Sequence, residues 1–150
     1  DPRNIHLTIR FLGDTEGHFV PLISKELSEV ARVSMVVICK LGGVGAFPNL
    51  NRPRVIWVGL ENNVDMLKNT ASDLEERMRT IGFAPEDKPF KPHLTLGRVR
   101  EGAPQISIAV EAISHMKPAE PVRLDKMILY QSTLTPQGPI YKSLFTAEFS

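Results

Sequence analysis

The stretches NIHLTIRFLG (residues 4–13) and KPHLTLGRVR (residues 91–100) both contain the tripeptide His-Leu-Thr. In an extended strand, alternate side chains share a face, so the His and Thr of each copy point one way and the Leu points the other. Chance placement of the 4 His and the Thr residues in 150 positions gives only about 0.03 such triplets with apolar residues at both alternate positions. The repeat therefore predicts two strands that each present an imidazole and a hydroxyl on one face.

Two imidazoles and two hydroxyls that converge suit acid–base chemistry on a phosphate. At neutral pH one imidazole can activate water as general base while the other protonates the departing oxygen. The hydroxyls and a cation would hold the non-bridging oxygens, where charge grows in the transition state. Arg98 is the best-placed cation, because a guanidinium can bind two oxygens. Strict alternation puts Arg98 on the face opposite to His93 and Thr95, so the sequence predicts a bulge, which Gly97 could supply.

Two rival chemistries fit the sequence less well. Two His without a nearby carboxylate or Cys leave too few ligands for zinc. A Ser-His-Asp triad lacks any nucleophile-elbow sequence. We therefore expect no metal and no cofactor, and strained five-membered cyclic phosphates suit this metal-free chemistry.

Length and composition limit the remaining possibilities. A chain of 150 residues suits one domain, or two small lobes that share a core. The net charge of +1 provides no global attraction to nucleic acid or membrane, so anion binding has to be local. Cys39 is the single cysteine and lies among apolar residues, which predicts a buried thiol and fits a reducing compartment. No apolar run approaches 18 residues, so we expect a soluble, cytoplasmic protein with no membrane contact.

Periodicity and turn residues predict an α+β fold. We expect antiparallel pairing of the close neighbours 33–47 and 54–60, and of the two last strands. Gly42, Gly43 and Gly45 are typical of a bulged strand rather than of a phosphate loop. This order indicates two similar lobes, each with an antiparallel sheet and helices, with the catalytic cleft between them. The expected strands are 4–12, 33–47, 54–60, 93–99, 121–131 and 140–149, and the expected helices are 18–32, 62–81 and 103–116.

The motifs and their flanks resemble a known family. The paired His-Leu-Thr motifs, with RFLGD after the first and GRVR after the second, look like the two-histidine phosphoesterase superfamily. Within it, the chain closely resembles the RNA 2′,3′-cyclic phosphodiesterases, also called 2′-5′ RNA ligases. The segments GAFPNLNRPRVIWVGL and LYQSTLTPQGPIYKSLFTAEF resemble the middle and the last hairpin of that family. The resemblance covers nearly the whole chain.

The resemblance implies a bilobal fold in which the catalytic strands face each other across a cleft. It implies metal-free cleavage of RNA 2′,3′-cyclic phosphate ends to 2′-phosphomonoesters, and some members join ends through 2′-5′ bonds. Substrates would be RNAs such as tRNA fragments, or small cyclic nucleotides, and the protein would act as a monomer. Family members usually carry a strand and a helix, about 35 residues, before the first motif. Residues 1–150 would then form a single two-lobed domain that lacks this segment.

The resemblance also implies roles for individual residues at matching positions. His6 resembles the proton donor to the leaving 3′ oxygen, and His93 resembles the proton acceptor that activates water. Thr8 and Thr95 would bind phosphate oxygens, with Arg98 beside them. Phe11 would line the nucleotide pocket, although its place on the other face of the strand fits a core residue equally well.

Two alternatives remain open from the sequence. The first is a 2′,5′-oligoadenylate phosphodiesterase, which shares the motif chemistry and differs only in its pocket. The second is a non-catalytic module that binds RNA ends, and a test of turnover separates it from an enzyme. It would use local cations, namely Arg3, Arg10, Arg52, Arg54, Lys88, Lys91, Arg98 and Arg100.

Overall fold

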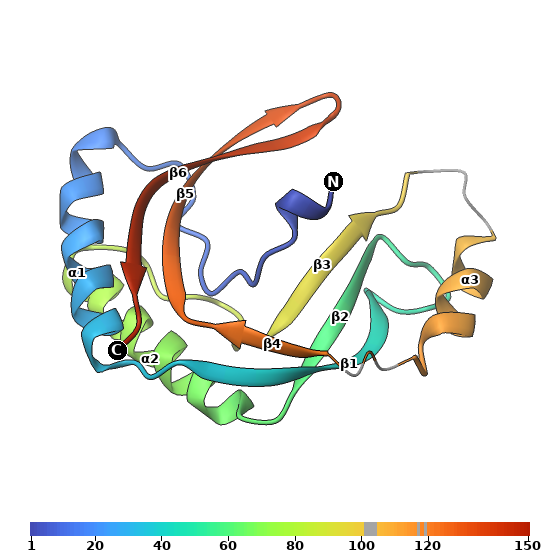
Figure 1. Ribbon diagram of the computed structural model, residues 1–150. Coiled ribbons are helices and arrows are strands. Elements are labelled where there is room, and N and C mark those ends of the chain that lie inside the picture. The colour runs from blue at the N-terminus through green and yellow to red at the C-terminus, as the bar shows by residue number, and fades with distance from the viewer. Residues whose placement is uncertain (101–104, 117, 119) are drawn as a thin grey trace. The chain divides into compact units, whose positions relative to one another are not determined.

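The computed structural model describes residues 1–100, 105–116, 118 and 120–150, and these form two compact units (Figure 1). Antiparallel strands and helices occur in both, which confirms the α+β class. Both His-Leu-Thr tripeptides lie in the first unit. The first unit holds Asp1–Ile9, Ile38–Val64 and Lys91–Val122, and the second holds Arg10–Val37, Asp65–Phe90 and Arg123–Ser150.

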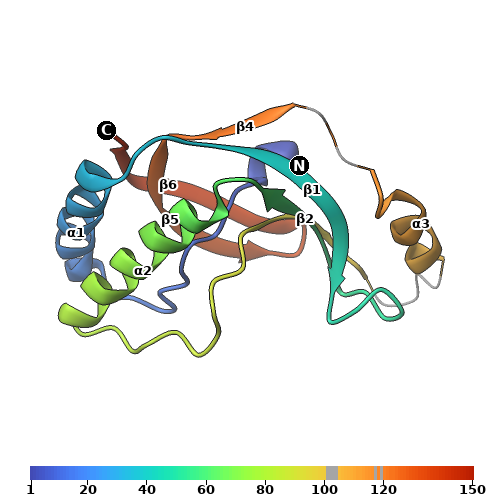
Figure 2. The same cartoon turned by 90° about the horizontal axis from the view of Figure 1, so that it is seen from below.

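The first unit is built around a sheet with the strand order β3-β2-β1-β4 (Figures 1 and 2). Its pairs β1–β2 and β2–β3 are antiparallel, as expected for the first of them. The register of β1–β2 shifts between Leu41 and Val44, so the glycines at 42 and 43 do mark a bulge. The bounds of the elements are β1 Val37–Phe47, β2 Val55–Glu61, β3 His93–Arg98, α3 Ile106–Ile113 and β4 Pro121–Leu124.

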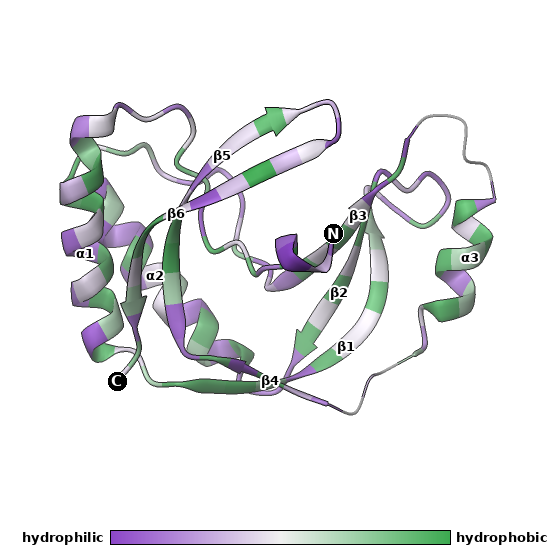
Figure 3. Ribbon diagram, turned by 45° about the horizontal axis from the view of Figure 1, so that its top comes forward, coloured by the Kyte–Doolittle hydropathy of each residue, from purple (hydrophilic) through white to green (hydrophobic). Residues whose placement is uncertain are grey.

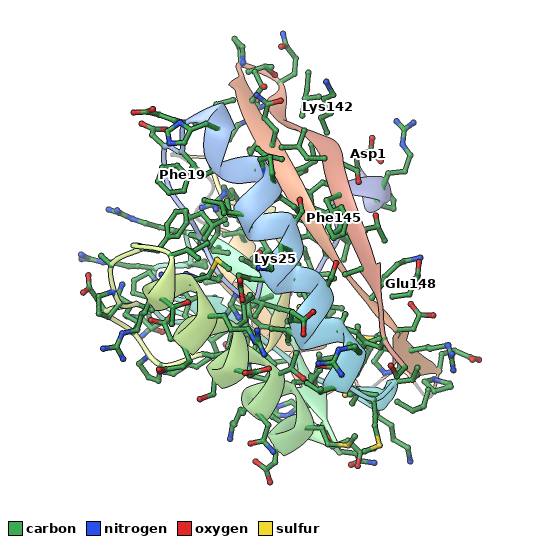
Figure 4. All side chains as sticks on the ribbon, turned by 90° about the vertical axis from the view of Figure 1, so that its left-hand side faces the viewer. Asp1, Phe19, Lys25, Lys142, Phe145 and Glu148 are labelled. Carbon is green, nitrogen blue, oxygen red and sulfur yellow. The ribbon has the colours of Figure 1, made fainter. Side chains whose placement is uncertain are left out.

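The second unit packs α1 (Val20–Val33) against the hairpin of β5 (Lys126–Thr135) and β6 (Gly138–Glu148), with α2 (Val64–Thr80) completing it. Figure 4 looks onto α1, with Lys25 on the helix and Phe145 on the hairpin beside it. Apolar residues on one side of each helix are buried, as the helical spacing predicts. The buried apolar residues of this unit are Ile23, Leu27, Val30, Ala31, Val37, Leu67, Ala71, Leu74, Met78, Met127 and Ala147.

The largest error of the sequence prediction concerns residues 4–12, which do not form a regular strand. Pro2–Asn4 form a 3-10 turn capped by the Asp1 carboxylate, and within the described residues the only strand contact of 4–12 is an isolated bridge at Leu7. The segment then passes into the second unit, where the Arg10 side chain is only 6% exposed and pairs with Glu75. This ion pair fixes the Arg10 side chain in the second unit.

The other predicted elements differ from the structure at their ends. The strand expected over 121–131 is broken into β4 and β5 at Asp125, whose carboxylate accepts a hydrogen bond from Arg123 at 3.1 Å. The helix expected over 103–116 is α3, and positions 103 and 104 of that prediction lie outside the described residues. Asn63 directly precedes α2, and its side-chain amide donates a hydrogen bond to the Ile38 carbonyl at 2.8 Å.

Two further predictions concern burial. Cys39 is fully buried in β1, as its apolar neighbours predict, and burial raises the pKa of its thiol. Figure 3 shows that polar and apolar residues alternate along the helices, rather than forming long apolar spans. Within the described parts of the chain, no helix has the length and the hydropathy that a membrane crossing requires.

Candidate functional site

The two His-Leu-Thr tripeptides lie side by side in the first unit, because Leu7 forms an antiparallel bridge with Leu94. In antiparallel geometry, the residues one step away from a bridge are also opposite each other and project to the other face. His6 is therefore set opposite Thr95, and Thr8 opposite His93. The bridge thus places the two tripeptides next to each other in one unit.

A bulge in β3 adds Arg98 to the face of His93 and Thr95. Thr95 pairs with Trp57, whereas Gly97 pairs with Ile56, so Leu96 has no partner and the register shifts there. Because β2 alternates regularly, the partners of Val55, Trp57 and Gly59 share a face. Those partners are Arg98, Thr95 and His93, so the bulge near Gly97 that the sequence predicts is confirmed.

Both imidazoles are held by the same local contact. The Nδ1 of His6 lies 2.7 Å from the Asn4 carbonyl oxygen, and the Nδ1 of His93 lies 2.6 Å from the Lys91 carbonyl oxygen. A carbonyl can only accept, so each Nδ1 must carry its proton and donate. Each neutral ring then keeps its lone pair on Nε2, the nitrogen that can take up or deliver a proton. The two histidines of the repeated motif therefore share the same tautomer, with the proton on Nδ1.

Two aromatic side chains enclose the ring of His93. Its centroid lies 5.2 Å from Phe47 and 6.2 Å from Trp57, both in edge-to-face arrangements, and the Phe47 and Trp57 centroids are 5.3 Å apart. The indole lies over Gly45, where an added Cβ would stand 2.4 Å from its Cζ2 atom. Gly45 is therefore required by close packing, and through the indole it sets the space available to His93.

The remaining predicted residues differ in exposure. Thr8 and Thr95 are half-buried, and Arg98 is exposed. Phe11 is 74% exposed, which excludes the core position that its face left open. Phe11 belongs to the second unit, whereas His6, Thr8, His93, Thr95 and Arg98 belong to the first. Among the described residues, no group of three or more His, Cys, Asp or Glu could hold a metal ion.

Phe47 and Trp57 are neighbours of His93 that the sequence did not assign to the site. Trp57 lies in the apolar run 54–60 and reads as a core residue, and Phe47 ends the strand before it. A signal was nevertheless present. Trp57 and Gly59 alternate on β2, and a glycine at 45 matches the large indole on the neighbouring strand. The register of β1, β2 and β3 was needed to place them against His93.

The chain is similar to curated proteins over nearly all of its length. It is 38% identical over 144 residues to the RNA 2′,3′-cyclic phosphodiesterase of Archaeoglobus fulgidus, covering 96% of this chain and 79% of that protein. It is 35% identical over 147 residues to the protein of the same name from Aeropyrum pernix, covering 97% and 82%.

Solved structures support the fold, and a family model identifies the family. The crystal structure of TT0787 from Thermus thermophilus matches with a TM-score of 0.85 at 27% identity, covering 99% of this chain and 80% of that one. E. coli LigT complexed with 3′-AMP matches in fold with a TM-score of 0.77 at 22% identity, covering 100% and 79%. The model for LigT like phosphoesterases matches residues 1–57 and 58–141. The chain therefore belongs to the LigT-like phosphoesterase family.

Proposed function

We propose that this chain is a metal-independent hydrolase that opens RNA 2′,3′-cyclic phosphate ends to 2′-phosphomonoesters. The observation that carries the proposal is the pairing of the two tripeptides at Leu7 and Leu94, together with the matching Nδ1 contacts of His6 and His93. This arrangement supplies two Nε2 atoms of the same tautomer, flanked by hydroxyls. The names of the relatives supply the substrate class.

In this reaction one imidazole takes up a proton from water and the other delivers a proton to the departing oxygen. His93 Nε2 takes a proton from water, whose oxygen attacks phosphorus, while the bond from phosphorus to the 3′ oxygen breaks. His6 enters the reaction as the imidazolium, which carries a proton on each nitrogen, and its Nε2 gives one of them to that oxygen, so the product carries a 3′-hydroxyl and a 2′-phosphate. Thr8, Thr95 and Arg98 hold the non-bridging oxygens as their charge grows. A 5′-hydroxyl of a second RNA in place of water would give a 2′-5′ bond by the same steps.

Other features support parts of the proposal. The His-Leu-Thr residues come from one chain and one unit, so we expect a monomer to suffice. Phe11 follows Thr8 by three residues and exposes its ring, which suits contact with a nucleotide base. Small cyclic nucleotides should also react, because the reacting atoms are the same.

The test is a product assay on a short RNA that ends in 2′,3′-cyclic phosphate, run with and without EDTA. We expect the rate to survive the chelator, the product to carry a 2′-phosphate, and the pH profile to be bell-shaped. His6→Ala and His93→Ala should each lower kcat by about 10²–10⁴-fold, with thermal unfolding unchanged. A folded variant that keeps more than about a tenth of the rate would exclude the acid–base role of that histidine.

A sulfur analogue separates the two roles. If the 3′ oxygen of the cyclic phosphate is replaced by sulfur, the leaving thiolate needs no proton. His6→Ala should then recover most of its activity, whereas His93→Ala should not, because water activation is still required. Recovery by His93→Ala instead would reverse the assignment of acid and base.

A further inference from the structure

The arginines of this chain fall into two groups. Among the described residues, which include every arginine of the sequence, six have a carboxylate oxygen within 4 Å. These are Arg3, Arg10, Arg32, Arg77, Arg79 and Arg123. The other four are exposed, and their guanidinium groups make no ion pair or hydrogen bond with the described parts of the chain. These are Arg52, Arg54, Arg98 and Arg100.

The four unpaired arginines lie at one end of the first unit's sheet. The Arg54 N–H donates to the Phe47 carbonyl at 2.8 Å, and the Arg54 carbonyl accepts from Val99 N–H at 2.9 Å. Arg98 and Arg100 flank Val99, and Arg52 precedes Arg54 by two residues. The end of β3 and the loop before β2 are correspondingly hydrophilic in Figure 3. We call Arg52, Arg54 and Arg100 the arginine edge.

The arginine edge continues the direction in which β3 runs away from His93. Along β3, His93, Thr95 and Arg98 share the site face because of the bulge at Leu96. Arg100 lies two residues beyond Arg98, a step of about 6.6 Å in an extended chain. A chain of phosphates whose last member sits at the histidines would therefore meet Arg100 on this face, while Arg52 and Arg54 lie at the same end of the sheet.

The sequence around these four arginines is poor in carboxylates, although Glu101 follows Arg100 directly. The sequence contains no Asp or Glu from position 30 to position 60, or from position 88 to position 100. These two stretches therefore carry positive charge that no carboxylate within them offsets. Elsewhere the same chain does supply carboxylates, as in the pairs Arg32–Glu29 and Arg79–Glu76. The edge is thus suited to an anion supplied by a ligand.

We propose that the arginine edge binds backbone phosphates of the single-stranded RNA that leads to the cyclic end. This inference rests on the proposed function, and it names the part of the substrate that lies beyond the terminal nucleotide. Guanidinium groups bind phosphate oxygens bidentately, and these contacts carry no base specificity. The edge therefore raises affinity for RNA over mononucleotides without choosing a sequence.

The test compares two substrates as salt is varied. One is a nucleoside 2′,3′-cyclic monophosphate, and the other is a ten-nucleotide RNA with the same end. For single strands, each phosphate contact adds about 0.7 to the slope of log affinity against log salt. In the variant Arg52→Gln/Arg54→Gln/Arg100→Gln, we expect the slope of log kcat/KM for the RNA to fall by about 2. At low salt, kcat/KM for the RNA should drop about tenfold or more, while the mononucleotide value stays unchanged.

A charge-matched control removes three paired arginines as Arg32→Gln/Arg79→Gln/Arg123→Gln. It changes net charge equally and should keep the wild-type slope on both substrates. A wild-type slope in the edge variant would overturn the inference, and so would equal losses on both substrates with the fold intact. If the wild-type protein turned over neither substrate, the proposed function would fail separately. Fluorescence anisotropy with the ten-nucleotide RNA would then test the role of the arginine edge. The inference requires that the triple Gln variant of the edge binds this RNA more weakly than wild type, and with a smaller salt dependence.

Discussion

Gly45→Ala tests whether the packing around His93 is as tight as the geometry indicates. The new Cβ would stand 2.4 Å from Trp57 Cζ2 and 2.5 Å from Cη2. The indole would have to retreat by about 1 Å to reach ordinary contact, and Phe47 and His93 lie next to it. Overpacking of this kind costs about 1–3 kcal/mol. For a chain of this size we therefore expect Tm to fall by about 2–12 °C.

The same displacement should also reach the reaction. Because misplacing a reacting group by about 1 Å can cost up to about 10²-fold in rate, we expect kcat for a cyclic mononucleotide to fall about 10–100-fold. The stability control is Gly59→Ala, because a Cβ there has its nearest neighbour at 3.6 Å. That variant should unfold within a few degrees of wild type. A Gly45→Ala protein with wild-type Tm and kcat would refute the packing argument.

Two further predictions concern stability and reactivity. Arg10→Met should lower the free energy of unfolding, measured in urea, by about 2–3 kcal/mol. The substitution removes the ion-pair partner of Glu75, whose side chain is only 28% exposed, and it removes the hydrogen bond from Arg10 to the Ala84 carbonyl at 2.6 Å. Arg10→Met/Glu75→Gln should regain part of that loss, and a single variant as stable as wild type would exclude a structural role for the pair. The Cys39 thiol should react with Ellman's reagent at pH 8 only as the protein unfolds, because burial hides it and raises its pKa; rapid labelling of the folded protein would contradict this burial.

The sequence predicted regular elements better than it predicted the first motif. The helices at Val20–Val33 and Val64–Thr80 follow from periodicity, because their buried residues repeat at helical spacing. The strand at Val55–Glu61 follows from its apolar run, and the strand at His93–Arg98 follows from the alternation of the second motif. The stretch 4–12 has the alternation of a strand but lacks a continuous partner. Alternation describes faces and says nothing about whether a neighbour is present. Pairing depends on where the chain goes next, and after Ile9 this chain passes into the second unit.

The site was predictable in its residue types but not in its arrangement. The repeated His and Thr indicated acid–base chemistry on a phosphate. The sequence also predicted that Arg98 joins their face only if the strand contains a bulge, and the register shift at Leu96 supplies it. The sequence could not reveal that both tripeptides belong to one unit, since that depends on contacts across 87 residues. The ring contacts of Phe47 and Trp57 with His93 depend on the register of three strands, and composition does not encode register.

The unpaired Leu96 has a consequence for how the motif should be compared among relatives. In a regular strand, side chains separated by an even number of residues project from the same face. In His-x-Thr-x-x-Arg the Arg follows the Thr by three residues, so on a regular strand it would project from the opposite face. The extra residue corrects this by half a period. A relative with one residue fewer between Thr and Arg would keep all three groups together on a straight strand. Insertions and deletions at this position should therefore be judged by odd or even count, rather than by conservation of the letter at 96.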